Sequence, residues 1–270
     1  MSDTFDLAAL ASLAGRLADA AGAAALPHFR AANLATDDKD QTGGFDPVTA
    51  GDREAEAAMR AVLRKERPDD GVFGEEEART FGTSGLTWIL DPIDGTRAFI
   101  SGLPVWGTLI ALDDGARGRI GVIDQPHIGE RFMGVLGADT ARASLTHNGN
   151  ETPITTRQGV RLADATVFTT DPYLFNARES ALFDTIRGRA RLTRYGVDCY
   201  AYALLAMGQV DLVVETDLAA YDIASHVPLI TAAGGIVTDW SGGDCRWGGR
   251  AVAAGSAALH AEALEILSTI

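Results

Sequence analysis

Cysteine and basic residues are both scarce in this chain of 270 residues. Its two cysteines, Cys199 and Cys245, have no metal-binding spacing, and two cysteines alone establish no disulfide. We expect both to be buried free thiols, as in a reducing cytoplasm. Lys and Arg total 23 against 37 Asp and Glu, which gives a formal net charge of −14. Such a surface repels phosphate backbones and anionic lipid, so we expect no nucleic-acid or membrane partner bound by general electrostatics.

Targeting signals and long apolar runs are lacking as well. The N-terminal segment MSDTFDLAAL carries acids where an export signal has Lys or Arg, so we expect a cytoplasmic protein. No stretch approaches the ~20 apolar residues of a membrane span. Hydrophobic residues nevertheless make up 46% of the chain. That content allows a sizeable core, in one large domain or in two packed halves.

The first half of the chain has the pattern of two helices followed by an antiparallel sheet. Leucines at helical spacing predict a helix from Leu7 towards Phe29, and a second helix is expected over 49–68. The polar stretch ATDDKDQTGGFDP predicts a loop between them. Short apolar stretches then predict strands at 71–77, 87–91, 107–112, 118–123 and 131–135.

The second half alternates strands and helices. Strands are expected at 165–170, 191–196, 210–216, 235–240 and 251–256, and helices at 178–189, 199–209, 221–235 and 257–270. We therefore predict an α/β (α+β) layered sandwich, with an N-terminal α+β half over 1–140 and a C-terminal α/β half over 141–270. No flexible linker separates the halves, so they are expected to pack rigidly with a cleft between them.

Carboxylates gather where these predicted elements begin or end. Asp46 lies just before the second helix, and Glu75 follows a strand. Asp91 and Asp94 end the next strand, in WILDPIDGT, and Asp222 lies early in a late helix. Several carboxylates that share a pocket repel one another and take up protons unless cations neutralise them. Oxygen-preferring Mg²⁺ suits such a set, and the five scattered histidines offer no softer site.

A structural explanation exists for each of these acids taken alone. Asp accepts backbone N–H groups at helix starts, and Asp-Pro and Asp-Gly are common turn dipeptides. Thr49 and Asp52 have the spacing of a capping box, and we interpret both as structural. Only the convergence of the other acids on one pocket favours chemistry.

Gly95 and Thr96, directly behind Asp94, indicate phosphate chemistry. Gly lets the backbone approach a ligand closely, and the N–H groups of a helix start bind phosphate. Metal-binding acids beside a phosphate site indicate phosphoryl transfer to water. We expect the Thr96 hydroxyl to orient that water, with Asp46 as its acceptor.

Four sequence blocks, in order, resemble the inositol monophosphatase family. WILDPIDGTRAFISG resembles the metal-site signature of that family, and YDIASHVPLITAAGGIVTDW resembles its second signature. GEE at Gly74–Glu76 and FDPVTAGDREAE at Phe45–Glu56 match the two remaining blocks. The resemblance covers nearly the whole chain. It implies a layered α/β fold and a homodimer.

Carried over by position, the resemblance implies a site for two or three Mg²⁺ ions. Glu75, Asp91 and the Ile93 carbonyl would bind the first ion. Asp91, Asp94 and Asp222 would bind the second.

The same resemblance implies the remaining roles at the reacting centre. Asp46 would bind a third ion or the activated water, and Gly95 and Thr96 would bind phosphate. Asp46, Glu75 and Thr96 are thus the expected catalytic residues. Glu76 would support the ligands from behind, and Glu77 would be solvated.

Two acids outside this set bear on the choice of substrate. Glu215 matches the family position that contacts substrate hydroxyls, and Asp198 falls where inositol monophosphatases carry a small neutral residue. Two buried acids favour a cationic leaving group, because each needs a partner. The stretches GTRAFISGLPVWGTLIAL and GVDCYAYALLAMG also resemble the histidinol-phosphatase branch, whose substrate has an amine and an imidazole. Alternatively, Asp198 caps the helix that follows it and Glu215 is a solvated strand end.

Four neighbouring residues have simpler interpretations. Trp106 and Tyr200 are expected in the core rather than in a pocket wall, and Cys199 as a packed thiol rather than a nucleophile. Arg97 is expected on the surface.

The sequence therefore predicts a Mg²⁺-dependent phosphomonoesterase that acts on a small phosphate monoester, histidinol phosphate being the expected substrate. An inositol-1-monophosphatase or a broad-specificity sugar-phosphate monophosphatase is the nearest alternative. A 3′-nucleotide bisphosphatase would call for basic residues where this chain has acids. A catalytically silent regulatory or interaction protein is the alternative from another class, and the intact acid set argues against it.

Overall fold

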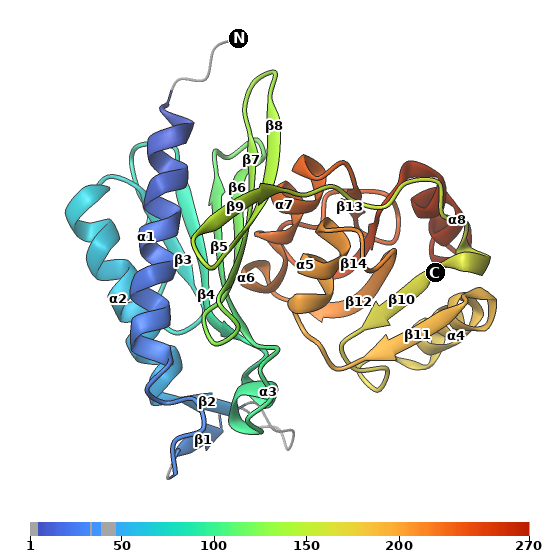
Figure 1. Cartoon of the computed structure of the whole chain (residues 1–270), viewed down its shortest axis with the longest axis horizontal. Coiled ribbons are helices and arrows are strands. Elements are labelled where there is room, and N and C mark those ends of the chain that lie inside the picture. Colours follow the sequence, from blue (N-terminus) through green and yellow to red (C-terminus); the bar gives the residue numbers. More distant parts are fainter. Residues whose placement is uncertain (1–4, 33, 39–46, 270) are drawn as a thin grey trace.

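Five layers, helix–sheet–helix–sheet–helix, make up the fold (Figure 1). The computed structural model describes residues 5–32, 34–38 and 47–269. Helices α1 (Leu7–Ala25) and α2 (Ala50–Glu66) cover the outer face of a seven-stranded sheet. A middle helical layer separates it from a five-stranded sheet, whose far face carries two more helices. The predicted α/β layered sandwich is confirmed.

The seven-stranded sheet follows chain order from β3 to β9, with β3 parallel to β4 and the other neighbours antiparallel. Its strands are β3 (Gly71–Gly74), β4 (Thr87–Asp94), β5 (Gly107–Asp113), β6 (Gly118–Gln125), β7 (Glu130–Leu136), β8 (Ala141–His147) and β9 (Asn150–Pro153). The five strands expected in the first half are all present. Strands β1 (Thr36–Asp38) and β2 (Pro47–Thr49) pair separately, where a loop was expected.

The hairpin of β8 and β9 was not predicted. Its turn is Asn148-Gly149, with φ angles of 51° and 75°. Asn-Gly adopts this left-handed turn readily and is a strong hairpin signal in a sequence. Because both strands join the first sheet, that sheet continues to Pro153, past the boundary expected at residue 140.

The five-stranded sheet is mixed, with the order β11-β10-β12-β14-β13. Its strands are β10 (Thr166–Thr169), β11 (Leu192–Tyr195), β12 (Leu212–Leu218), β13 (Ile236–Thr238) and β14 (Gly249–Ala254). Helices α4 (Ala177–Arg189) and α8 (Ala257–Leu267) lie on its outer face, next to the short 3₁₀ helix Leu162–Asp164. All five strands expected in the second half are confirmed.

The middle layer contains α5 (Tyr200–Ala206), α6 (Ala220–Ile223) and α7 (His226–Ala232). One helix over 221–235 was expected, and this prediction is wrong: the chain breaks between α6 and α7. Pro228 explains the break, because it lies in the first turn of α7, where its missing N–H needs no partner, whereas inside one long helix it would remove a hydrogen bond.

Helix α7 also joins the two halves. A Cβ atom on Gly134 would lie 2.3 Å from the Cα of Leu229, and one on Gly121 would lie 1.9 Å from the carbonyl oxygen of Ser225. Two glycines of the first sheet thus allow α7 and the turn before it to lie directly on the strands. This contact fixes the position of Asp222, in the adjacent α6, relative to β4.

Helix α1 corrects the expectation about apolar runs. By length and composition it could cross a membrane, although core helices of other proteins pass the same test. In this structure one face of α1, from Leu10 to Ala25, is buried against α2 and the first sheet.

Candidate active site

The site begins at a bulge in β4. Asp91 lies opposite Leu109 of β5, but Asp94 lies opposite Gly107, so β4 has one residue more than its partner between these points. Pro92, which has no N–H for the ladder, sits inside the bulge. Residues three apart on a regular strand point to opposite faces, and the extra residue brings both carboxylates to one side.

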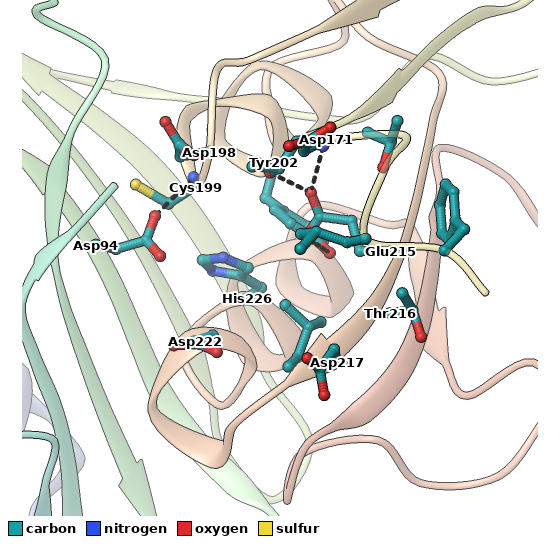
Figure 2. A pocket seen from close by; sticks show the side chains of 15 residues that line it. Asp94, Asp171, Asp198, Cys199, Tyr202, Glu215, Thr216, Asp217, Asp222 and His226 are labelled. Atoms are coloured by element: carbon teal, nitrogen blue, oxygen red, sulfur yellow. Dashed lines mark hydrogen bonds between the residues drawn. The ribbon is translucent and has the colours of Figure 1, made fainter. Parts of the chain in front are cut away.

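Asp222 completes a group of three carboxylates with Asp91 and Asp94. One oxygen from each lies within 4.8 Å of the others, as predicted for a shared metal site. Figure 2 shows Asp94 and Asp222 at one end of a pocket. Asp222 also accepts the Ala219 N–H at 2.7 Å, which orients its side chain at the start of α6.

Electrostatics favour a cation at this group. Burial, and then the charges of Glu75, Asp94 and Asp222, raise the pKa of Asp91 well above its usual value. Burial, followed by the charges of Asp198 and Asp222, likewise raises the pKa of Asp94. Oδ1 of Asp91 is buried and has no hydrogen-bond partner within the described part of the chain.

A hard divalent ion such as Mg²⁺ fits this donor set, since it prefers carboxylate oxygens and relieves their repulsion. Asp91, Asp94 and Asp222 would hold it, together with Glu75 in the turn after β3. Bound there, it would neutralise phosphate oxygens and lower the pKa of a water.

The Thr96 side chain contacts Asp52, to which the sequence assigned only a structural role. Its hydroxyl lies 3.0 Å from the Ile93 carbonyl oxygen and 3.4 Å from Oδ1 of Asp52. A hydroxyl has one proton, so it donates to one of these oxygens at a time. Asp46, the expected acceptor, lies outside the described residues. Within them, the acceptor carboxylate beside Thr96 belongs to Asp52.

Asp52 therefore has more than the structural role assigned to it from the sequence. It completes the capping box of α2 as predicted, accepting from Thr49 N at 2.8 Å and from Thr49 Oγ1 at 2.6 Å. Its other oxygen faces Thr96. The signal was present in the sequence, because Asp52, Glu56 and Met59 share the face of α2 that is buried.

Gly95 adopts φ = 80° at the start of the short helix α3 (Thr96–Ile100). A Cβ atom there would lie 3.0 Å from a carboxylate oxygen of Asp198. A larger residue would be strained and crowded at this position. Phosphate binding by Gly95 and Thr96 stays a prediction.

The pocket beyond the three carboxylates has a volume of about 180 Å³ and lies between the two halves (Figure 2). Carboxylates line it: Asp94, Asp171, Asp198, Glu215, Asp217 and Asp222. No Lys or Arg occurs among the described residues of its lining. Its one histidine, His226, is buried, and burial lowers its pKa to about 3, so the ring is neutral. The pocket is therefore strongly acidic.

Asp198 does not cap the helix that follows, so that alternative is wrong. The N-cap of α5 is Cys199, whose backbone N–H donates to Oδ2 of Asp94 at 2.8 Å. Asp198 has φ = 43°, a left-handed conformation uncommon for non-glycine residues. Burial raises its pKa to about 6, against an opposing effect from the charge of Arg97. Its carboxylate lines the pocket.

Glu215 is buried rather than solvated at a strand end, so the alternative is wrong here too. Its Oε1 accepts from the N–H and the hydroxyl of Thr170, at 3.0 and 2.5 Å, and its Oε2 accepts from the Tyr202 hydroxyl at 3.0 Å. Burial raises its pKa to about 7, against these hydrogen bonds. Thr170 and Tyr202 were missed in the sequence: Thr170 belongs to no motif, and nothing in the stretch GVDCYAYALLAMG separates Tyr202 from a core aromatic residue.

The simpler interpretations of nearby residues hold. Trp106 is 1% exposed within the core, and the Tyr200 hydroxyl donates to Glu130 at 2.8 Å, away from the pocket. Both cysteines are buried free thiols, and burial raises the pKa of Cys199, which disfavours a nucleophilic thiolate. Arg97 is exposed.

Comparison with known proteins places these features in a family. Residues 6–270 match the model of the inositol monophosphatase family. The bifunctional phosphatase IMPL2 of Arabidopsis thaliana, described as chloroplastic, is 39% identical over 99% of this chain and 77% of its own length. A histidinol-phosphatase of Streptomyces coelicolor is 36% identical, covering 95% of this chain and 96% of its own.

A solved structure agrees in fold. An inositol monophosphatase from Zymomonas mobilis is 44% identical, covers 96% of this chain and 97% of its own, and superposes with a TM-score of 0.82. The chain therefore belongs to the inositol monophosphatase family, whose members are metal-dependent phosphatases.

Proposed function

We propose that this protein is a Mg²⁺-dependent phosphomonoesterase whose substrate is histidinol phosphate. The observation that carries the substrate is the acidic pocket. A neutral polyol can donate its hydroxyls to the two buried carboxylates, but it brings no positive charge to offset the cost of burying theirs. A leaving group with an ammonium would pair with them and favour their charged forms.

The residues divide the work along the pocket. Asp91, Asp94, Asp222 and Glu75 would hold the ion at the phosphate end. When Thr96 donates its proton to Asp52, its oxygen keeps lone pairs that can accept a hydrogen bond from the attacking water and orient it.

The leaving group would lie towards the second half of the chain. Glu215 is held there by hydrogen bonds from Thr170 and Tyr202, and Asp198, which lies close to Gly95, lines the same pocket. Both acids lie on or next to defined elements, so they can select a leaving group by charge and by shape.

Steady-state kinetics on histidinol phosphate, myo-inositol 1-phosphate and glycerol phosphate test the substrate. We expect kcat/KM to be highest for histidinol phosphate. We also expect the gene to restore growth of a histidinol-phosphatase-deficient auxotroph. A higher kcat/KM for inositol phosphate would overturn the assignment while leaving the phosphatase activity in place.

The variant Asp198→Asn tests whether the charge of Asp198 contributes to this choice of substrate. Asn tolerates the left-handed backbone as well as Asp does, and the side-chain volume barely changes. A charge-assisted hydrogen bond contributes roughly 1.5–3 kcal/mol, so kcat/KM on histidinol phosphate should fall about 10- to 100-fold. Glycerol phosphate, which has no cation, should be hydrolysed equally well by both enzymes. Equal losses on the two esters would make Asp198 a structural residue.

An inositol-1-monophosphatase is the second candidate. It is supported by the name of the Zymomonas mobilis relative and by Glu215, whose carboxylate could also accept substrate hydroxyls. The kinetic comparison above separates the two. Phosphate release with and without EDTA separates both from a silent member of the family. We further propose that the protein is cytoplasmic and that it forms a homodimer. Sedimentation of the purified chain can test the dimer.

A further inference from the structure

A carboxylate outside the pocket holds the turn that carries Glu75. Glu56 lies on α2, one helical turn after Asp52, and its side chain is fully buried. Its Oε2 accepts the backbone N–H of Glu76 at 2.7 Å, and its Oε1 accepts that of Glu77 at 3.0 Å. The backbone directly after Glu75 is therefore bonded to α2.

Arg60, one turn further along α2, completes the arrangement. Its Nε donates to Oε1 of Glu56 at 2.7 Å, and its Nη2 donates to the carbonyl oxygen of Glu77 at 3.0 Å. The Arg60 side chain is 5% exposed. We call the Glu56 carboxylate and the Arg60 guanidinium the clamp. It binds the turn through both N–H and C=O groups.

The backbone before Glu75 is fixed by packing. A Cβ atom on Gly74 would come within 2.1 Å of the Glu56 carboxylate. The turn thus rests directly on the clamp, which only glycine allows here. Glu75 lies between a residue packed against Glu56 and a residue hydrogen-bonded to it, so the clamp restricts the backbone on both sides of Glu75.

We infer that the clamp is a positioning device that sets the affinity of the site for its divalent ion by holding Glu75. Removing one partner of this buried ion pair also lowers stability strongly, because the other charge is left buried without its counter-charge. Groups that orient a metal ligand, by contrast, typically change metal affinity about 10- to 100-fold when mutated. The inference rests on the metal dependence in the proposed function, but not on the identity of the substrate.

Glu56→Gln and Arg60→Met together test the clamp. They change the local charge in opposite directions, so a purely Coulombic effect would weaken Mg²⁺ binding in the first variant and strengthen it in the second. Loss of positioning weakens binding in both. Glu54→Gln is the matched control, since Glu54 lies on the same helix, is exposed and pairs with His28 instead.

Mg²⁺ binding is measured by calorimetry on the intact protein, and turnover of p-nitrophenyl phosphate is measured against Mg²⁺ concentration. We expect both clamp variants to bind Mg²⁺ about 10- to 100-fold more weakly, with kcat at saturating Mg²⁺ near wild type. Glu54→Gln should behave as wild type. If either clamp variant fails to fold, Arg60→Lys keeps the charge but loses the planar contact to Glu77, and it too should bind Mg²⁺ more weakly.

Two outcomes would overturn the inference. Mg²⁺ affinity equal to wild type, with only the melting temperature in EDTA lowered, would make the clamp a structural tie between α2 and the turn. Tighter Mg²⁺ binding in Arg60→Met would mean that Arg60 acts on the ion only through its positive charge, and not by positioning Glu75. Failure of the proposed function looks different, because then the wild-type protein itself would bind no Mg²⁺ or release no phosphate.

Discussion

At the scale of single residues, the site is a set of acids whose roles are set by their surroundings. Asp91 is buried among other carboxylates, and Glu215 is buried among hydrogen-bond donors. Asp52 is also buried, yet it caps a helix with one oxygen and faces Thr96 with the other. These environments, more than the residue type, distinguish the proposed metal ligands from the groups that we propose to orient water or select the substrate.

The pairing of Asp52 with Thr96 gives the first prediction. If the pair orients the attacking water, Asp52→Asn and Thr96→Val should each lower kcat about 10²- to 10⁴-fold with little change in KM. The double variant should lose little more, because the two groups act as one unit. Steady-state kinetics at saturating Mg²⁺ provide the measurement. The amide oxygen of Asn can still accept the Thr49 N–H, so the capping box of α2 is kept. Near-normal turnover of Asp52→Asn would show that Asp52 only caps the helix.

Glu215 gives a prediction about pH. Its raised pKa of about 7 means that the carboxyl is neutral below this pH and charged above it. For a cationic ester, kcat/KM should therefore rise as pH passes through about 7, and Glu215→Gln should lose that component. Taking the ratio of wild type to variant on one ester cancels the ionisation of the substrate. A ratio that stays flat from pH 5.5 to 8.5 would show that the charge of Glu215 plays no part in binding.

At the scale of elements, the sequence predicted the positions of the strands well. It predicted less well which residues the packing of these strands and helices brings into contact. Strands such as β4 and β5 each contain a short apolar stretch, and that pattern alone identifies them. The break between α6 and α7 and the Asn148-Gly149 hairpin depend on local backbone chemistry that periodicity does not weigh. Thr170 and Tyr202 reach Glu215 only through the packing of β10, α5 and β12, which no local pattern encodes.

The same reason explains why Asp52 was missed as a partner of Thr96. Only the packing of α2 against the end of β4 places Asp52 beside Thr96. The proposed ligands Asp91 and Asp94 were accessible from the sequence because a single bulged strand carries both.

The contact between α7 and the first sheet gives an element-scale prediction. Gly134→Ala would place a methyl group against the backbone of Leu229, and overpacking of this kind costs about 1–3 kcal/mol of unfolding free energy. Because α7 follows Asp222 closely, Mg²⁺ affinity should fall as well. Gly188→Ala is the control, since nothing lies within 4 Å of its added Cβ and α4 should gain stability. The free energy of unfolding is measured by denaturant titration. Equal values for the two variants would show that the contact between Gly134 and α7 leaves room for a methyl group.

At the scale of the whole molecule, the active site lies where the two halves meet, and its acids oppose folding when no ion is bound. Asp91 and Asp94 come from the first half and Asp222 from the second, so their repulsion acts across the junction. The acidic pocket extends the same charge into the second half through Asp198 and Glu215. Binding a divalent ion should therefore stabilise the whole chain rather than one element.

This stabilisation should depend on pH in a defined direction. The folded-state pKa values of Asp91 and Asp94 are raised above those of the unfolded chain. Their contribution to stability without metal is thus fully present below the ordinary pKa of Asp and is lost as pH rises towards the folded-state values. Protons also compete with Mg²⁺ for the same oxygens at low pH. Both effects make the rise in melting temperature on adding Mg²⁺ larger at pH 8 than at pH 5, in scans with EDTA as reference. Asp94→Asn, which removes one charge, should melt higher than wild type in EDTA at pH 8 and gain less from Mg²⁺. A shift in melting temperature that is the same at both pH values would mean that carboxylate repulsion does not limit the stability of the metal-free protein.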